Sequence, residues 1–141
     1  MPAKPYIIPC LLYRDAPAAI DFLCTAFGFE RREVHVDPND ASIVVHAQLT
    51  LGDAMIMLSS QRADPGREKY RFRTPQEAGG VTTCICVAID DPDAHYARAK
   101  AAGAVIVTPP HDNAGYPGRS YNCFDGEGHN WDFSTYDPLA G

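Results

Sequence analysis

The sequence predicts an α+β fold built from two copies of one βαβββ module. A repeat supports the duplication, because three residues recur after 75 positions: Asp15, Pro17 and Gly28 return as Asp90, Pro92 and Gly103. Self-similarity at a fixed spacing marks a duplicated structural unit. A strand-like run precedes the helical segment that these residues bound in each copy, and three extended runs follow that segment. Each module therefore has the order βαβββ.

Both copies carry the residues that begin and end a helix. Asp15, and Asp90 in the second copy, can accept hydrogen bonds from the N–H groups of a first turn. Gly28 suits the position after a helix, which commonly needs a positive φ. An apolar stripe at helical spacing lies between them: Ile20, Leu23 and Phe27. The second helix, roughly 92–102, is rich in alanine, and we expect His95 at or near its surface.

The predicted strands set the bounds of the two modules. Runs 7–13 and 82–89 precede the helices, and Pro9 leaves one unpaired position in the first run. The extended runs that follow are 31–36, 43–51 and 54–59 in the first copy and 105–108, 119–124 and 130–135 in the second. We therefore expect one domain over 1–141, with module one at 5–60 and module two at 81–137.

Between the modules, residues 61–80 are rich in charge, proline and glycine, which predicts a long loop. Loops of this length in compact domains are usually functional or mobile. This one carries Tyr70 and Phe72 beside two arginines, Arg71 and Arg73. Two interpretations stay open, a solvated linker and a lid that closes a binding site.

The first predicted hairpin has two faces of different chemistry. Gly52 and Asp53 are typical of a two-residue turn. One face is then wholly apolar and should lie against the helices: Ala47, Leu49, Leu51, Ala54, Ile56 and Leu58. The other face holds His46, Gln48, Thr50, Met55, Met57 and Ser59. Two flexible thioethers favour a concave binding face over a solvated one.

The stretch DGEGHNWDF, residues 125–133, gathers three acids and a histidine around two glycines. It has the chemistry of a type I turn followed by a left-handed residue, which Gly128 supplies without strain. We expect Asp125 to bond the backbone N–H groups of its own turn, and Glu127 and His129 to project to solvent. Turn chemistry alone therefore accounts for these three side chains.

Asp132 is the acid of this stretch that we assign to a pocket. Trp131 and Phe133 alternate with it and should share the core face. The repeat adds a second reason, because Asp132 lies 75 positions after Met57 and should occupy the matching point on the second inward face. A one-residue slip of the register would exchange the two faces.

Composition excludes some partners and compartments. The net charge is −6, from 12 basic and 18 acidic residues, and phosphate binding by nucleic-acid proteins needs clustered cations instead. Acidity favours cationic or neutral ligands, although it also serves solubility. No apolar run approaches the roughly 20 residues of a membrane span, and no signal-peptide pattern is seen. The five cysteines include no CxxC pair, as suits reduced thiols in a cytoplasmic protein.

Three stretches in this order resemble the vicinal oxygen chelate superfamily, which contains glyoxalase I, the bleomycin-resistance proteins and the extradiol dioxygenases. They are YRDAPAAIDFLCTAFGF at 13–29, AQLTLGDAMIML at 47–58 and YNCFDGEGHNWDFSTYDP at 121–138. The resemblance implies a curved eight-stranded sheet around a U-shaped cleft, and dimers in many members. Gly126 departs from the family pattern, which usually has proline at that point.

Metal-dependent members of this superfamily carry four ligands on the inward faces, and the resemblance places them at Ile8, Met57, Cys84 and Asp132. Ile8 cannot bind a metal, and the Met57 thioether is a poor ligand for a hard divalent ion. Cys84 and Asp132 alone fall short of a three-ligand catalytic site, although His46 could add a third contact. We therefore expect no metal and no other cofactor.

The leading hypothesis is a metal-free protein that binds a small molecule, an antibiotic among the candidates, as in the bleomycin-resistance branch. The expected ligand-binding residues are His46, Gln48, Met55, Met57, Asn130 and Asp132, with Tyr116 and Arg119 near the mouth. The alternative is an enzyme, a glyoxalase-like lyase or isomerase or a dioxygenase with an unusual metal site, in which His46 and Asp132 exchange protons. A regulatory role for the same cleft is a third hypothesis. We also expect a homodimer, because duplicated half-sheets leave open strand edges.

Overall fold

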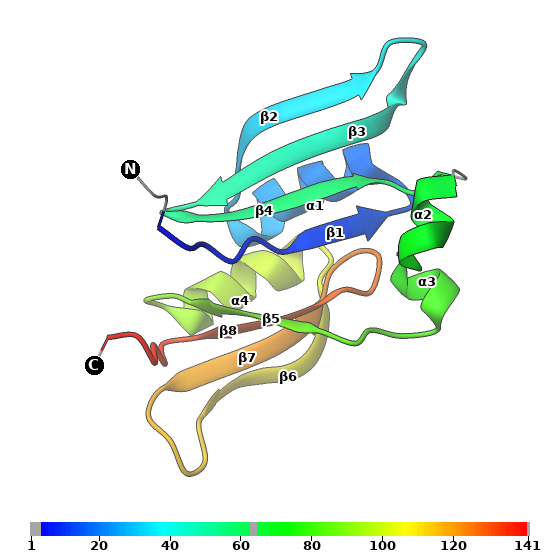
Figure 1. Ribbon diagram of the computed structural model, residues 1–141. Coiled ribbons are helices and arrows are strands. Elements are labelled where there is room, and N and C mark those ends of the chain that lie inside the picture. Colours follow the sequence, from blue (N-terminus) through cyan, green and yellow to red (C-terminus); the bar gives the residue numbers. More distant parts are fainter. Residues whose placement is uncertain (1–3, 63–64, 141) are drawn as a thin grey trace. The chain divides into compact units, whose positions relative to one another are not determined.

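The computed structural model describes residues 4–62 and 65–140, and it confirms an α+β fold of two βαβββ modules (Figure 1). The first module contains β1 (Cys10–Tyr13), α1 (Ala16–Phe27), β2 (Glu30–Asp37), β3 (Asp40–Leu51) and β4 (Ala54–Ser60). Two short helices follow, α2 (Pro65–Tyr70) and α3 (Pro75–Ala78). The second module contains β5 (Cys84–Ala88), α4 (Pro92–Ala101), β6 (Val105–Asp112), β7 (Arg119–Phe124) and β8 (Asn130–Ser134).

Each module makes its own four-stranded sheet, and the two sheets have the same topology. Their strand orders are β1-β4-β3-β2 and β5-β8-β7-β6. The first strand of each module pairs in parallel with the last, and the other pairs are antiparallel. Met57 lies between Cys10 and Gln48, and Asp132 lies between Cys86 and Asn122. Met57 and Asp132 therefore occupy equivalent strands, as the repeat predicted.

The helix caps correct one detail of the repeat. The Asp15 carboxylate accepts a bond from the backbone N–H of Ala18, at 3.2 Å. In the second module the cap is Asp91, which accepts from Ala94 at 3.1 Å, and not the predicted Asp90. The second copy has two adjacent acids, Asp90 and Asp91, so the sequence did not determine which of them caps the helix. The spacing between equivalent residues is thus 76 at the start of the helices and 75 in the last strands.

Several predicted bounds also differ. The first strand begins at Cys10 rather than residue 7, although the carbonyl of Pro9 still accepts a bond from the Met57 N–H. β6 continues to Asp112, beyond the predicted end at 108. Residues 61–80 hold α2 and α3 where a loop was predicted. Both helices begin at a proline, whose missing N–H has no partner in a first turn.

By their internal contacts the residues form two compact units, and the boundary falls inside α1. The first unit holds the chain up to Ile20 together with Phe29–Thr74, and the second holds Asp21–Gly28 together with the chain from Pro75 onward. The predicted apolar face of the first hairpin is buried at Ala47, Leu49, Ile56 and Leu58, and open only beside the turn. In the second unit, the fully buried Trp131 and Phe133 rings lie 5.2 and 4.8 Å from the Phe27 ring.

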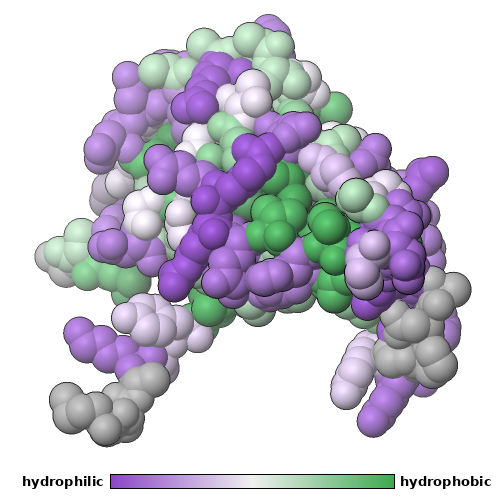
Figure 2. Space-filling view, turned by 90° about the horizontal axis from the view of Figure 1, so that it is seen from above, coloured by the Kyte–Doolittle hydropathy of each residue, from purple (hydrophilic) through white to green (hydrophobic). Residues whose placement is uncertain are grey.

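The edge strands expose apolar side chains. β2 ends the first sheet and carries Val34 and Val36, which are 40% and 43% exposed. β6 ends the second sheet and carries Val105 and Val107, which are 59% and 52% exposed. Figure 2 shows one side of the molecule, where hydrophobic groups lie open among hydrophilic ones. No helix in the described part of the chain is long and apolar enough to cross a membrane.

Candidate functional site

The second sheet has a polar face made of Cys84, Cys86, Asn122, Asn130 and Asp132. On β8, Trp131 and Phe133 are buried in the core. Because side chains alternate along a strand, Asn130 and Asp132 point away from the core. The Asn122 amide donates to Asn130 Oδ1 and to Asp132 Oδ2, both at 3.1 Å. Asn130 donates back to Asn122 Oδ1 at 2.7 Å. This network fixes the orientation of the Asp132 carboxylate.

The polar face includes two thiols, Cys84 and Cys86. Cys84 is opposite Asn130 in the register, and Cys86 is opposite Asp132. Burial, the neighbouring Cys86 thiol and the Asp132 carboxylate together raise the pKa of Cys84 to about 11. The thiolate is the form that binds metals and attacks electrophiles. Cys84 therefore remains a neutral thiol that can pack against a ligand.

The first sheet has a thioether face made of His46, Gln48, Met55 and Met57. Gln48 lies opposite Met57 on the neighbouring strand. All four side chains are half-buried, and the Gln48 amide lies 3.2 Å from His46 Nε2. The structure thus places these four residues on one face, beside hydrogen-bonding groups. Such a surface can adapt to an apolar ligand and still bond its polar atoms.

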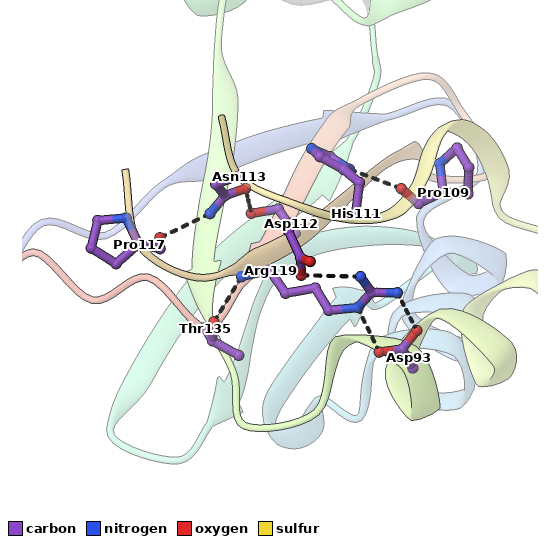
Figure 3. Close-up of polar contacts among 9 residues, drawn as sticks. Asp93, Pro109, His111, Asp112, Asn113, Pro117, Arg119 and Thr135 are labelled. Atoms are coloured by element: carbon purple, nitrogen blue, oxygen red, sulfur yellow. Dashed lines mark hydrogen bonds and ion pairs between the residues drawn. The ribbon is translucent and has the colours of Figure 1, made fainter. Parts of the chain in front are cut away.

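Arg119 lies on the side of β7 opposite to Asn122, whose register partner is Asp132. Figure 3 shows its guanidinium beside Asp93 and Asp112. Arg119 alternates with Ser120 and shares its side of β7 with the buried Tyr121. Its guanidinium donates to both carboxylate oxygens of Asp93 on α4, at 2.9 and 3.0 Å, and to Asp112 at 3.2 Å. The sequence could not show this pairing, because it depends on where α4 lies over the sheet.

Tyr116 lies in the loop between β6 and β7 and is half exposed. Its ring meets the ring of Tyr136 edge to face, with centroids 5.3 Å apart. The second unit therefore brings Asn130 and Asp132 together on one face, and it brings neither Tyr116 nor Arg119 into their hydrogen-bond network.

Asp125 closes the β7–β8 turn from inside. Its carboxylate is 2% exposed and accepts from the backbone N–H groups of Glu127 and His129, at 2.9 and 3.2 Å. This confirms the predicted turn. The other carboxylate oxygen accepts from the Trp131 indole at 3.1 Å, a bond that the sequence did not reveal. Asp125 is thus a structural acid, anchored to the core.

His95 lies near the surface, as expected, and is half-buried among three elements. Its Nε2 donates to the Phe27 carbonyl at 3.2 Å, its Nδ1 accepts from the Tyr121 hydroxyl, and its ring lies 4.2 Å from that of Phe133. Burial lowers the pKa of His95, and the Arg98 charge adds to that effect. The imidazole is therefore a neutral bridge between α4, the end of α1 and β7.

A cavity of about 190 Å³ lies in the first unit, and the sequence did not predict it. Its lining residues are Leu12, Val45, Ser59, Ser60, Arg62, Arg67, Tyr70 and Phe72. Tyr70 and Phe72 had drawn attention only as aromatic residues in an expected loop. The two arginines beside them in the sequence, Arg71 and Arg73, do not line the cavity, and the arginines that do are Arg62 and Arg67.

The donor set does not fit a divalent metal. Of the four positions that the resemblance assigns to ligands, Ile8 cannot bind a metal, and Met57 and Cys84 offer sulfur rather than a hard donor. Among the described residues, no group of three histidine, cysteine, aspartate or glutamate side chains is arranged to hold a metal ion. The chemistry of both faces is instead that of hydrogen bonding and adaptable packing.

Comparisons with known proteins agree with this fold. Two mycobacterial proteins, each described as uncharacterized, are 32% identical over 128 residues, or 91% of this chain. They are Mb0911c of Mycobacterium bovis, of which 81% is covered, and Rv0887c of Mycobacterium tuberculosis, of which 72% is covered. Among solved structures, TioX from Micromonospora sp. ML1 is similar with a TM-score of 0.68 at 29% identity, covering 92% of this chain and 94% of TioX.

The fosfomycin resistance protein FosX from Mesorhizobium loti has a TM-score of 0.67 at 16% identity, covering 98% of this chain and 96% of FosX, and shows likeness of fold alone. A family model matches residues 7–133, which is nearly the whole chain. With its duplicated module, this chain belongs to the Glyoxalase/Bleomycin resistance protein/Dioxygenase superfamily.

Proposed function

We propose that this protein binds a small organic molecule without the help of a metal ion. There are two candidate ligand-binding surfaces, the thioether face of the first sheet and the polar face of the second. Each is considered separately. Asp132 is the carboxylate of the polar face, and its bond from Asn122 holds it in one orientation. This arrangement favours a ligand with an apolar body and a cationic or hydrogen-bond-donating group.

One observation carries the proposal, the identity of the side chains at the four assigned ligand positions. An isoleucine, a methionine and a cysteine leave Asp132 as the single hard donor among them. Catalytic metal sites need about three protein ligands with an open position. The superfamily relationship supports small-molecule chemistry in general, and FosX, named as a fosfomycin resistance protein, suggests antibiotics among the compounds to test.

Elemental analysis separates this proposal from the enzyme alternative. The protein would be expressed with manganese, iron, nickel and zinc in the medium, purified without chelators and dialysed. We expect each metal far below stoichiometry. A content of about one metal atom per chain that survives dialysis would contradict the proposal and favour a metal-dependent lyase, isomerase or dioxygenase.

Ligand binding is tested by thermal denaturation against a library of aromatic cations, uncharged aromatic compounds and antibiotics. A ligand that binds only the native state stabilises it by about 2.7 kcal/mol at a concentration 100 times its dissociation constant. We expect stabilisation by members of the aromatic-cation group. If no compound of any group raises the unfolding temperature, small-molecule binding is contradicted.

We further propose a homodimer in the cytoplasm. The open strand edges at β2 and β6 carry exposed valines, and such edges are usually covered by another chain or element. Sedimentation at micromolar concentration should give the mass of two chains, and a monomer mass would contradict it. The free thiols of Cys84 and Cys86 support a reducing compartment.

A further inference from the structure

We infer that the cavity of the first unit is a second binding site, which takes a small aromatic carboxylate. This goes beyond the proposed function, because the residues differ and the ligand has the opposite charge. The floor of the cavity comes from the first sheet, where Leu12 on β1 and Ser59 on β4 are register partners. The walls come from the chain after β4, at Arg62, Arg67 and Tyr70, and from Phe72 just beyond α2.

The size of the cavity limits the ligand to about one ring. Its volume is about 190 Å³, and a protein cavity of about 150 Å³ accommodates benzene. Leu12, Val45 and Phe72 supply apolar surface for such a ring. The space that remains suits one small polar substituent rather than a second ring.

The charge of the lining selects an anion. Two guanidinium groups, from Arg62 and Arg67, line the cavity, and no carboxylate stands among its described lining residues. This contrasts with the net charge of −6 for the chain. A planar guanidinium matches a carboxylate in a two-bond geometry that an ammonium group cannot provide.

Hydroxyl groups complete the polar side of the cavity. Ser59, Ser60 and Tyr70 each contribute one. Ser60 is buried, and its oxygen accepts from the Val44 backbone N–H at 2.9 Å, which holds that side chain in place. Because this bond uses the oxygen as acceptor, the Ser60 proton is available to a carboxylate oxygen.

The competing interpretation is that the two arginines only cover apolar surface with their methylene chains. In that case the cavity would show no preference between charged and uncharged rings. A binding site should instead prefer charged rings, and it should lose that preference when a guanidinium is removed. This selectivity distinguishes a carboxylate-binding site from arginines that only pack against apolar surface.

The test is calorimetric titration with benzoate and with benzamide, its uncharged analogue of the same shape. We expect benzoate to bind at least about tenfold more tightly than benzamide, as the loss of one charge-assisted hydrogen bond would give. R67Q and R62Q should each weaken benzoate binding by about the same factor. R71Q is the matched control, because Arg71 lies beside these residues and does not line the cavity, and it should change binding by less than about twofold.

Methyl NMR locates the ligand and checks folding at the same time. Benzoate should shift the methyl signals of Leu12 and Val45 and leave those of Val107, in the second unit, unchanged. The inference is overturned if benzoate fails to bind at millimolar concentration, if benzamide binds equally, or if neither arginine variant weakens binding while its spectrum remains native. D132N should leave benzoate binding intact, so failure here and failure of the proposed function remain distinguishable.

Discussion

The two hairpins that close the modules occupy equivalent places and are stabilised differently. The β3–β4 turn consists of Gly52 and Asp53, both exposed, and Gly52 has a φ of +57°. The β7–β8 turn is longer and is built around Asp125, whose carboxylate is 2% exposed and accepts three hydrogen bonds. One turn is therefore held by its backbone, and the other by a buried charge.

The helices of the two modules, α1 and α4, also differ at equivalent positions. The caps make Ala19 of α1 equivalent to His95 of α4, and Leu23 equivalent to Ala99. The first module thus buries an alanine where the second has a half-buried imidazole with two hydrogen-bond partners. Duplication preserves the topology here, whereas the side chains at these equivalent positions differ in polarity. Each prediction below compares a residue with its counterpart.

The largest effect is expected at Asp125. Asp125→Ala removes the acceptor of two backbone N–H groups and the Trp131 indole, and should lower the free energy of unfolding by about 3 kcal/mol. Asp53→Ala, in the exposed turn, should change it by less than about 0.5 kcal/mol. Urea denaturation monitored by Trp131 fluorescence measures both. Equal losses in the two variants would show that the two turns do not differ in this way.

The second prediction compares the matching positions Asp132 and Met57. For an aromatic cation identified by thermal denaturation, Asp132→Asn should weaken binding by about 1–3 kcal/mol, the scale of a charge-assisted hydrogen bond. Met57→Leu keeps the volume of the thioether and should cost less than about 1.5 kcal/mol. Titration calorimetry gives both values. Unchanged binding in the aspartate variant would remove Asp132 from the proposed site.

The third prediction concerns the glycines of the two turns. Gly128 has a φ of +93°, outside the left-handed helical region that a side chain tolerates, so Gly128→Ala should cost about 1–2 kcal/mol. A Cβ there would meet the Pro75 side chain at 3.4 Å, an ordinary contact, so the cost is backbone strain. Gly52→Asn, at a left-handed φ with open space around it, should cost less than about 1 kcal/mol. Chemical denaturation measures the free energy of unfolding of both variants. A larger loss in Gly52→Asn than in Gly128→Ala would contradict the prediction.

The smallest effect is expected from His95 as the pH changes. Burial holds the pKa of His95 below its usual 6.5 in the folded state, while the unfolded chain takes up the proton near 6.5. Its contribution to stability is therefore complete above about pH 6.5 and declines as the pH falls below that value.

His95→Gln should remove this part of the pH dependence. Denaturation curves at about pH 7.5 and about pH 5.5 would be compared for both proteins. The wild type should lose more stability between the two than the variant. An equal loss would assign the acid sensitivity to other groups.

Repetition and turn chemistry predicted most of the fold. Asp15 and Gly28 bound a helix, and Asp125 closes a turn, because these depend on interactions within a few residues. The faces of β4 and β8 followed from alternation, once the repeat had set their register. Met57 and Asp132 could therefore be matched from the sequence.

Contacts between distant residues could not be predicted in the same way. Arg119 bonds Asp93, 26 residues earlier, because α4 covers that side of the sheet. The Trp131 indole reaches Asp125 only when β8 has its observed register. The cavity needs α2 beside the first sheet, and α2 occupies a stretch whose prolines and charges predicted a loop.

The division of α1 between the two units has a consequence for how the chain is made. Phe27 is translated well before the aromatic rings that contact it, because Trp131 and Phe133 belong to β8. About 100 further residues must leave the ribosome before this ring can be buried. A nascent chain with only its first sheet therefore displays an apolar helix end, a natural target for chaperones until β8 arrives.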